Sequence, residues 1–229
     1  MRPTVLLFDI DGTLVTTGGA GRRAIERAFE HLHSHRNACT FPLDGMTDRA
    51  IVRAGLKAIG LQPVDALIDQ VLVGYVQILE EEVAKVDAAE YRLHIGIASA
   101  LDAARARPEI AIGLGTGNIK EGARVKLTRV GIYERFSFGG FGCDHEDRAE
   151  ILRQGANRGA ERLGLPLGKC RVVAIGDTPK DVIAAKDSGF ECVGVGTGRY
   201  SARELIESGA TAAFSNLADQ GAVQAILGF

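Results

Sequence analysis

Acidic side chains gather where one short apolar run ends. Asp9 and Asp11 follow the run Thr4–Phe8, and Gly12 comes directly after them. Two carboxylates held so close repel each other unless a cation lies between them or one of them keeps a proton. Carboxylate oxygens are hard ligands of the kind that Mg²⁺ prefers. The pair therefore predicts a magnesium site. The alternative is an ordinary strand-end turn, because Asp-Gly is a common turn pair.

A second pair of aspartates follows a later apolar run. Asp177 and Asp181 come after Arg171–Ile175 and are four residues apart, with Pro179 favouring the first turn of a helix between them. At this spacing the two carboxylates approach each other, so that one can reach a metal ion and the other can support it. The alternative is that both complement the helix dipole, which explains one aspartate more easily than two.

A hydroxyl and backbone donors follow the run Ile110–Leu114. Thr116 offers its hydroxyl, and Gly117 and Asn118 offer N–H groups where a helix is expected to begin. Such a helix N-terminus is a natural anion site. The alternative is an ordinary helix start that Asn118 caps.

A lone arginine, Arg148, is expected in the first turn of another helix. Asp144 and Asp147 precede it with the spacing of a capping box. A cation is mildly unfavourable in a first turn, which favours another partner for Arg148, such as a phosphate bound in bidentate fashion. The alternative is a surface ion pair with Asp144 or Asp147.

Three further polar residues precede a helix much earlier in the chain. Thr47, Asp48 and Arg49 could reach the part of a substrate that leaves in the reaction. The alternative is that Thr47 or Asp48 only caps the helix.

The elements that must position these residues alternate along the chain. Short apolar runs without polar alternation predict strands buried on both faces, and helical patterns separate them. This order predicts an α/β fold, a Rossmann-like parallel sheet with helices on both faces. The carboxyl ends of parallel strands lie at one edge, so the acids, the hydroxyl, the amide donors and Arg148 should meet there as a Mg²⁺-phosphate site. The expected strands are Thr4–Phe8, Ile110–Leu114, Phe136–Phe141, Arg171–Ile175, Glu191–Val195 and Thr211–Phe214.

Residues 16–91 break this alternation. They contain helical patterns at Gly21–His33, Asp48–Ile59 and Val64–Lys85, and a weak strand signal at Cys39–Phe41. We expect an inserted α-helical cap domain over residues 16–91 and an α/β core of residues 1–15 and 92–229. The glycine-rich stretch Thr16–Gly21 is the expected hinge.

Composition excludes several classes of protein. The 229 residues carry 27 basic and 29 acidic side chains, a net charge of −2, without the basic excess of a nucleic-acid binder. The early apolar run Val5–Phe8 is too short for a membrane span or a signal peptide, so a cytoplasmic protein is expected. The four cysteines lack a C-x-x-C spacing, and His31 and His35 share a face only at a polar helix end, so neither set predicts a metal site.

The motifs, in their order along the chain, resemble the haloacid dehalogenase-like phosphohydrolase superfamily. These motifs are Asp9-x-Asp11-Gly-Thr, Thr116-Gly-Asn, Arg148 and Gly176-Asp177-x-x-x-Asp181. The helical insert resembles the C1-type cap, and Phe8–Arg22 is similar to phosphoglycolate-phosphatase-like members. The resemblance implies that Asp9 is the nucleophile and Asp11 the general acid and base. It also implies that Asp9, the Asp11 carbonyl and Asp177 hold Mg²⁺, that Asp181 orients them, and that Thr116 and Arg148 hold the phosphoryl group.

The reaction implied is hydrolysis of a small phosphorylated metabolite, phosphoglycolate-like or a sugar phosphate, by a monomer or small homo-oligomer. The family most often has a lysine where this chain has Arg148. Asp11 argues against dehalogenation, because a halide leaves without a proton. A phosphomutase resembling β-phosphoglucomutase and a non-catalytic binding protein remain alternatives. A receiver domain is disfavoured, because such domains are about half this length and have no helical cap.

Overall fold

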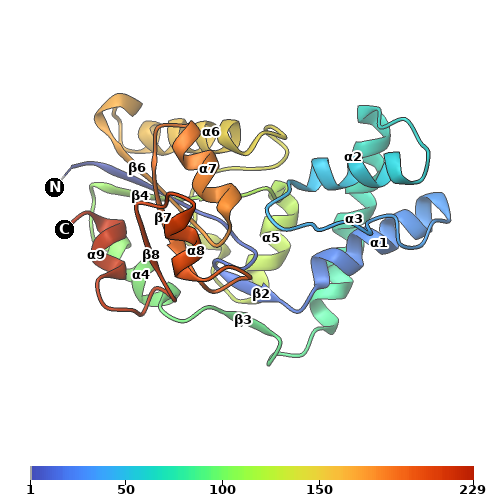
Figure 1. The fold of residues 1–229 in the computed structure, drawn as a ribbon, viewed down its shortest axis with the longest axis horizontal. Coiled ribbons are helices and arrows are strands. Elements are labelled where there is room, and N and C mark those ends of the chain that lie inside the picture. Colours follow the sequence, from blue (N-terminus) through green and yellow to red (C-terminus); the bar gives the residue numbers. More distant parts are fainter. Residues whose placement is uncertain (1) are drawn as a thin grey trace.

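The computed structural model describes residues 2–229, which fold into a parallel sheet with helices on both faces and a helical unit at one end (Figure 1). The six strands of the main sheet are all parallel and lie in the order β5-β4-β1-β6-β7-β8. They are β1 (Thr4–Phe8), β4 (Ile110–Gly115), β5 (Gly139–Gly140), β6 (Arg171–Gly176), β7 (Glu191–Val195) and β8 (Ala212–Phe214). The predicted α/β fold is confirmed.

Strand β1 lies in the middle of the sheet, between β4 and β6, and all of its residues are buried. Alternate residues of a strand point to opposite faces. Leu6 and Phe8 pack with α4 (Ile97–Arg105), α5 (Lys120–Arg129) and α9 (Ala222–Leu227). Val5 and Leu7 pack on the other face, against α6 (Arg148–Arg162), α7 (Pro179–Asp187) and α8 (Ala202–Glu207). The sheet is therefore covered on both sides, as continuous apolar strands require.

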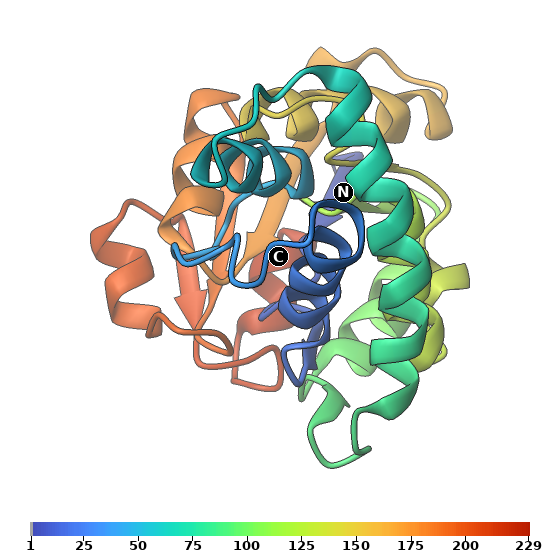
Figure 2. The same ribbon diagram turned by 90° about the vertical axis from the view of Figure 1, so that its right-hand side faces the viewer.

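The helical unit has a core of its own. It consists of α1 (Ala20–His33), α2 (Asp48–Ala58) and α3 (Asp65–Lys85), whose buried side chains form one apolar cluster. Helix α5 of the main body contributes Val125 to that cluster. Figure 2 shows the long helix α3 beside α1, facing the viewer in front of the sheet. We propose that residues 16–91 act as a cap over the core formed by residues 1–15 and 92–229.

A two-stranded antiparallel ribbon connects the two parts, and the sequence did not predict it. Strand β2 (Val15–Thr17) pairs with β3 (Tyr91–Leu93), so the chain enters and leaves the cap side by side. Gly18 and Gly19 follow β2 with φ values of 54° and 75°, in the left-handed region that favours glycine. The predicted hinge Thr16–Gly21 thus contains the end of a strand, a turn and the start of α1.

Two predicted strands differ from the structure. Cys39–Phe41 forms no strand, and the predicted strand Phe136–Phe141 is reduced to β5. Strand β5 lies at the edge of the sheet and pairs only through Leu114 and Gly115. Short edge strands of this kind limit unwanted pairing with other chains. Two short 3₁₀ helices, Tyr133–Arg135 and Leu167–Lys169, complete the elements.

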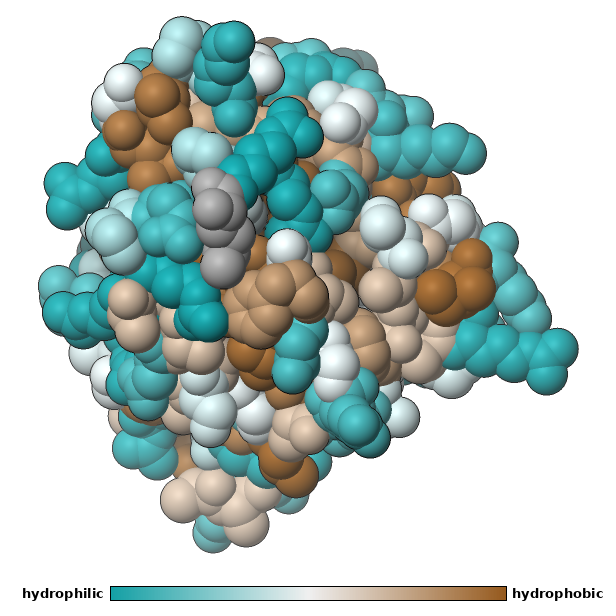
Figure 3. Space-filling view, turned by 90° about the vertical axis from the view of Figure 1, so that its left-hand side faces the viewer, coloured by the Kyte–Doolittle hydropathy of each residue, from teal (hydrophilic) through white to brown (hydrophobic). Residues whose placement is uncertain are grey.

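The surface away from the cap is mixed in polarity. Figure 3 shows hydrophilic side chains there, with separate apolar patches among them. Within residues 2–229, no helix has the length and hydropathy needed to span a lipid bilayer.

Candidate active site

Asp9 and Asp11 lie directly beyond β1, at the carboxyl edge of the sheet. The Asp9 amide donates to the Ile175 carbonyl over 2.9 Å, which continues the pairing of β1 with β6 by one residue. The chain then curls back at Gly12, whose φ is +81°. Asp9 is buried, whereas the Asp11 side chain keeps 43% of its surface exposed. Of the two aspartates, Asp9 is therefore the buried carboxylate and Asp11 is the one that faces a cavity.

Asp177 and Asp181 reach the same place from the end of β6 and the first turn of α7. One carboxylate oxygen from each of Asp9, Asp177 and Asp181 lies within 4.8 Å of the others. The Thr13 hydroxyl donates to Asp177 over 3.1 Å. Gly12 and Gly198 hold Asp177 closely, since a Cβ at either position would collide with an Asp177 carboxylate oxygen. These glycines let the backbone close around the carboxylate.

The charges of this acidic cluster are poorly compensated. Burial, together with the charges of Asp181 and Asp11, raises the pKa of Asp9 to about 6, although Arg148 acts in the opposite direction. Burial and the charges of Asp181 and Asp9 raise the pKa of Asp177 to about 8. Three convergent carboxylates with too little positive charge are a suitable donor set for a hard divalent cation. The residues present therefore fit Mg²⁺.

Arg148 lies against this cluster from the first turn of α6. Its Nη2 is 2.9 Å from Asp9 Oδ2 and 2.5 Å from Asp181 Oδ1, and its Nε donates to Asp181 Oδ1 over 2.7 Å. Nη2 is buried and has no acceptor in hydrogen-bonding alignment among residues 2–229. A donor in this state is free to bind a phosphoryl oxygen once the cation has balanced the acids.

The surface ion pair considered for Arg148 is not formed. Asp144 pairs with Arg158 and accepts from the Phe141 amide, and Asp147 caps α6 by accepting from the Ala149 amide. The prediction of a capping box between Asp144 and Asp147 is therefore wrong. Each acid has a separate partner, which leaves Arg148 to the cluster at the sheet edge.

Thr116, Gly117 and Asn118 form the third wall of the site, after β4. Thr116 is fully buried, and its hydroxyl accepts from Asn118 through both the backbone amide and the side-chain Nδ2. The same Nδ2 donates to Asp11 over 2.9 Å. Asn118 is not the cap of α5, because Ile119 holds that position without a side-chain hydrogen bond. The side chain of Asn118 faces the carboxylates instead.

The start of α2 in the cap rests on this wall. The Asp48 amide donates to the Gly117 carbonyl over 2.9 Å, and the Asp48 carboxylate accepts from the Ile119 amide over 2.8 Å. A Cβ on Gly117 would lie 2.7 Å from the Met46 carbonyl, so glycine permits this close contact. Burial raises the pKa of Asp48 to about 6, although Lys126 acts in the opposite direction. Asp48 lines the cavity and also joins cap to core.

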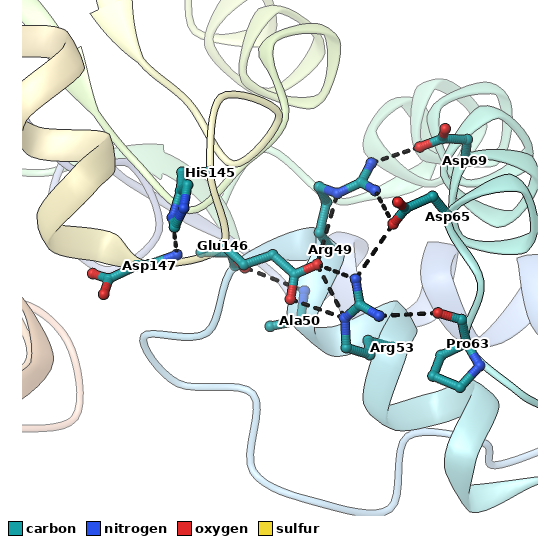
Figure 4. Close-up of polar contacts among 10 residues, drawn as sticks. Arg49, Ala50, Arg53, Pro63, Asp65, Asp69, His145, Glu146 and Asp147 are labelled. Atoms are coloured by element: carbon teal, nitrogen blue, oxygen red, sulfur yellow. Dashed lines mark hydrogen bonds and ion pairs between the residues drawn. The ribbon is translucent and has the colours of Figure 1, made fainter.

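Thr47 and Arg49 are placed differently from Asp48. Thr47 is buried and caps α2 by accepting from the Ala50 amide. This is the capping role that was predicted from the sequence as the alternative to substrate contact. Arg49 is not part of the cavity lining. It pairs with Asp65 and Asp69 of α3 (Figure 4). The structure thus brings neither side chain to the acids, and only Asp48 of the three faces the site.

A salt bridge between cap and core lies beside Arg49. Glu146, in the loop before α6, accepts from Arg53 of α2 through Nε and Nη2, at 2.7 to 3.1 Å, and lies 3.8 Å from Arg49 (Figure 4). Both partners are about one-third exposed. A bidentate arginine pair within a small network is the kind of surface salt bridge that contributes measurably.

We predict that Glu146→Gln loosens the docking of the cap. Losing this pair should shift the equilibrium between docked and undocked cap by up to about fivefold, because an exposed ion pair contributes up to about 1 kcal/mol. Hydrogen exchange of residues 45–53 should speed up accordingly. Glu150→Gln is the matched control, because Glu150 pairs with Arg153 inside α6 and leaves the cap untouched. Equal exchange in both variants would show that Glu146 does not hold the cap.

Lys126 is the main site residue that the sequence did not predict. It lies on α5, is 3% exposed, and donates to Asp11 over 2.7 Å and to the side-chain Oδ1 of Asn118 over 2.6 Å. Burial would raise the pKa of Asp11, but the Lys126 ammonium, together with the Asn118 hydrogen bond and Arg148, holds that pKa below its usual value. The sequence around Lys126 also contains Arg124, Thr128 and Arg129, so no local pattern marked Lys126 as buried.

The cavity between cap and core has a volume of about 330 Å³. The core contributes Asp9, Asp11, Asn118, Lys126, Arg148 and Asp177 to its walls, and the cap contributes Arg22, Asp48 and Tyr75. The polar residues therefore converge on a partly open cavity large enough for a small organic phosphate.

Comparison with known proteins agrees with this geometry. The family model described as haloacid dehalogenase-like hydrolase matches residues 3–189. A search of curated proteins found no match. Among solved structures, the chain resembles CbbY from Rhodobacter sphaeroides in complex with phosphate, with a TM-score of 0.71 and 21% identity over 96% of this chain and 97% of that one.

Two further structures show the same fold. β-Phosphoglucomutase from Clostridium difficile has a TM-score of 0.69 and 18% identity, over 95% of this chain and 92% of that one. A predicted phosphoglycolate phosphatase from Haemophilus somnus has a TM-score of 0.68 and 17% identity, over 95% and 96%. The family match confirms the resemblance and the expectation of an enzyme. The chain belongs to the haloacid dehalogenase-like hydrolase family.

Proposed function

We propose that the protein is a Mg²⁺-dependent phosphatase that hydrolyses a small phosphorylated metabolite through an aspartyl-phosphate. The observation that carries this proposal is the convergence of Asp9, Asp177 and Asp181 with the Arg148 guanidinium at one edge of the sheet. Asp9, Asp177 and the backbone carbonyl of Asp11 would hold the Mg²⁺. When bound, the ion offsets the negative charge of the phosphoryl oxygens.

The side chains then divide the two steps of hydrolysis. Asp9 attacks phosphorus, and its bond to the phosphoryl group forms as the bond to the ester oxygen breaks. Asp11 gives a proton to the leaving oxygen and afterwards takes one from the water that cleaves the aspartyl-phosphate. Arg148 and the Gly117 N–H group bind the transferring oxygens, while the Asn118 amide donates to Thr116. Thr116 and Asp181 position these groups through Asn118, Asp9 and Arg148.

The cavity lining favours an ester whose leaving group carries no second charge. Each cation of the lining already has acidic partners: Lys126 has Asp11, Arg148 has Asp9 and Asp181, Arg199 has Asp44, and Arg22 has Glu26. Arg49 is turned toward Asp65 and Asp69. A carboxylate or a second phosphate on the substrate would find no unpaired cation in this lining. A sugar monophosphate therefore fits better than phosphoglycolate or a bisphosphate.

Relatives with this fold handle related ligands. One structure is a mutant of the Rhodobacter sphaeroides CbbY protein in complex with xylulose-1,5-bisphosphate, and two others are described as β-phosphoglucomutases. A mutase must bind a bisphosphate intermediate, for which the paired cations of this cavity are poorly suited. We therefore favour hydrolysis over phosphoryl transfer between sugar hydroxyls.

A panel of phosphate esters tests this function. With Mg²⁺, we expect phosphate release from sugar monophosphates to exceed that from phosphoglycolate and from sugar bisphosphates. Interconversion of glucose 1-phosphate and glucose 6-phosphate without phosphate release would establish the mutase instead. A folded protein that binds Mg²⁺ and releases phosphate from no ester would support a non-catalytic binding protein.

A further inference from the structure

Lys126 lies on α5, in the wall of the cavity that also contains Asp9, Asp11 and Asp177. It is 3% exposed, and two oxygens accept from its ammonium: Asp11 Oδ2 at 2.7 Å and Asn118 Oδ1 at 2.6 Å. Burying an ammonium is costly unless it is paired and hydrogen-bonded. An apolar side chain at this position of α5 would avoid that cost. The arrangement therefore requires a reason beyond packing.

The Asp11 carboxylate has few other restraints. Its side chain is 43% exposed, and among residues 2–229 it accepts only from Lys126 and from Asn118 Nδ2, at 2.7 and 2.9 Å. Asn118 is fixed in turn, since its Nδ2 also donates to the Thr116 hydroxyl. Lys126 and Asn118 thus hold one oxygen of Asp11 between them. Without Lys126, a half-exposed aspartate with one remaining partner would visit other rotamers.

The cap completes the enclosure of Lys126. Gly21 of α1 lies so near that a Cβ there would come within 3.3 Å of the Lys126 ammonium and 3.9 Å of the Tyr75 hydroxyl on α3. Asp48 and Tyr91 also face this group, and the Tyr91 hydroxyl donates to the Lys126 carbonyl over 2.9 Å. Helices α1 and α3 therefore cover the Lys126 ammonium, whereas the Asp11 carboxylate stays open to the cavity.

We propose that Lys126 is a positioning residue that holds the Asp11 carboxylate in the place from which it exchanges protons with the leaving oxygen and the attacking water. This inference rests on the proposed function. It assigns Lys126 to the orientation of Asp11 on the basis of their geometry. Because cap helices cover the Lys126 ammonium, docking of the cap also helps to keep this partner of Asp11 in place.

A double-mutant cycle between Lys126 and Asp11 tests the inference. The variants are Lys126→Met, Asp11→Asn and the double variant, assayed on a sugar monophosphate with Mg²⁺. We expect Lys126→Met to lower kcat by about 10- to 100-fold, the range for a misplaced proton-transfer group, with little change in KM. In the Asp11→Asn background, the same change should cost less than about twofold, since residues that act as one unit are non-additive.

Two measurements separate positioning from folding. Binding of beryllofluoride with Mg²⁺, followed by ¹⁹F NMR, reports on Asp9 and the metal site and should be unchanged in Lys126→Met. Lys120→Met is the matched control on the exposed side of the same helix and should keep normal kcat. If Lys126→Met does not fold, Lys126→Gln, whose shorter amide cannot reach Asp11 equally well, replaces it in the same cycle.

The outcomes distinguish this inference from the proposed function. The inference is overturned if the wild type hydrolyses the ester and Lys126→Met has the same kcat. It is also overturned if the effects of the two substitutions on kcat multiply, because Lys126 then does not act through Asp11. If the wild type hydrolyses no phosphate ester, or Asp9→Asn remains active, the proposed function itself fails. Loss of kcat at unchanged KM, together with non-additivity, supports the positioning role.

Discussion

Asp9→Asn is expected to lower phosphate release from a sugar monophosphate by at least about 10⁴-fold, the scale seen when a nucleophile is removed. Asparagine keeps the shape and the buried position of Asp9 but cannot attack phosphorus as a carboxylate does. Arg148, Asp177 and the backbone donors remain, so the variant should still bind the ester. Steady-state phosphate release and equilibrium binding of the substrate measure these two effects separately.

The stability of the same variant serves as its control. Asp9 is crowded by Asp177 and Asp181, and burial first, then neighbouring acidic charge, raises its pKa to about 6. Replacing it by a neutral side chain should keep or raise the free energy of unfolding at neutral pH without metal. Substantial activity in a purified Asp9→Asn protein would contradict the assignment of the nucleophile.

Removal of Mg²⁺ is expected to lower activity by about 10³-fold, since a metal ion at a transferring phosphoryl group contributes several kcal/mol. Chelation with EDTA should be reversed by added Mg²⁺. Asp177→Asn should require a higher Mg²⁺ concentration for half-maximal activity, because one anionic ligand is lost from the donor set. Activity that survives EDTA treatment, or a Mg²⁺ requirement that Asp177→Asn leaves unchanged, would contradict the metal site.

The raised pKa values also predict how the stability of the metal-free protein changes with pH. The pKa values of Asp9 and Asp177 rise from 3.8 to about 6 and about 8 in the fold. The folded state therefore binds protons that the unfolded state has lost, so the metal-free fold loses stability as the pH rises from about 4 to about 8. Mg²⁺ requires ionised carboxylates, so its stabilising effect should grow over the same range. Thermal unfolding with and without Mg²⁺, at about pH 5.5 and about pH 8.5, checks this trend.

The fold could be predicted because the strong signals were local. Continuous apolar runs followed by glycine and acids predict buried parallel strands, and β1, β4 and β6 lie where those runs occur. Parallel pairing then places the residues that follow each strand at one edge. That rule brings Asp9 and Asp177 together, whereas Arg148 reaches them from the first turn of α6.

The parts that failed depend on contacts distant in sequence. The ribbon of β2 and β3 joins segments about 75 residues apart, and three residues per strand give too weak a pattern to recognise. Arg49 was expected to face the substrate, but Asp65 and Asp69 of α3 provide nearer acidic partners. The sequence did not predict a role for Lys126, because its partner Asp11 is 115 residues away.

Direct detection of the covalent intermediate tests the central claim most directly. The protein would be mixed with a sugar monophosphate and Mg²⁺, quenched in acid within the first turnover, digested, and analysed by mass spectrometry. We predict a phosphoryl group on the peptide that contains Asp9, and its absence when Asp9→Asn is treated in the same way. A phosphoryl group on another residue, or rapid turnover with no phosphorylated peptide at any quench time, would contradict Asp9 as the nucleophile.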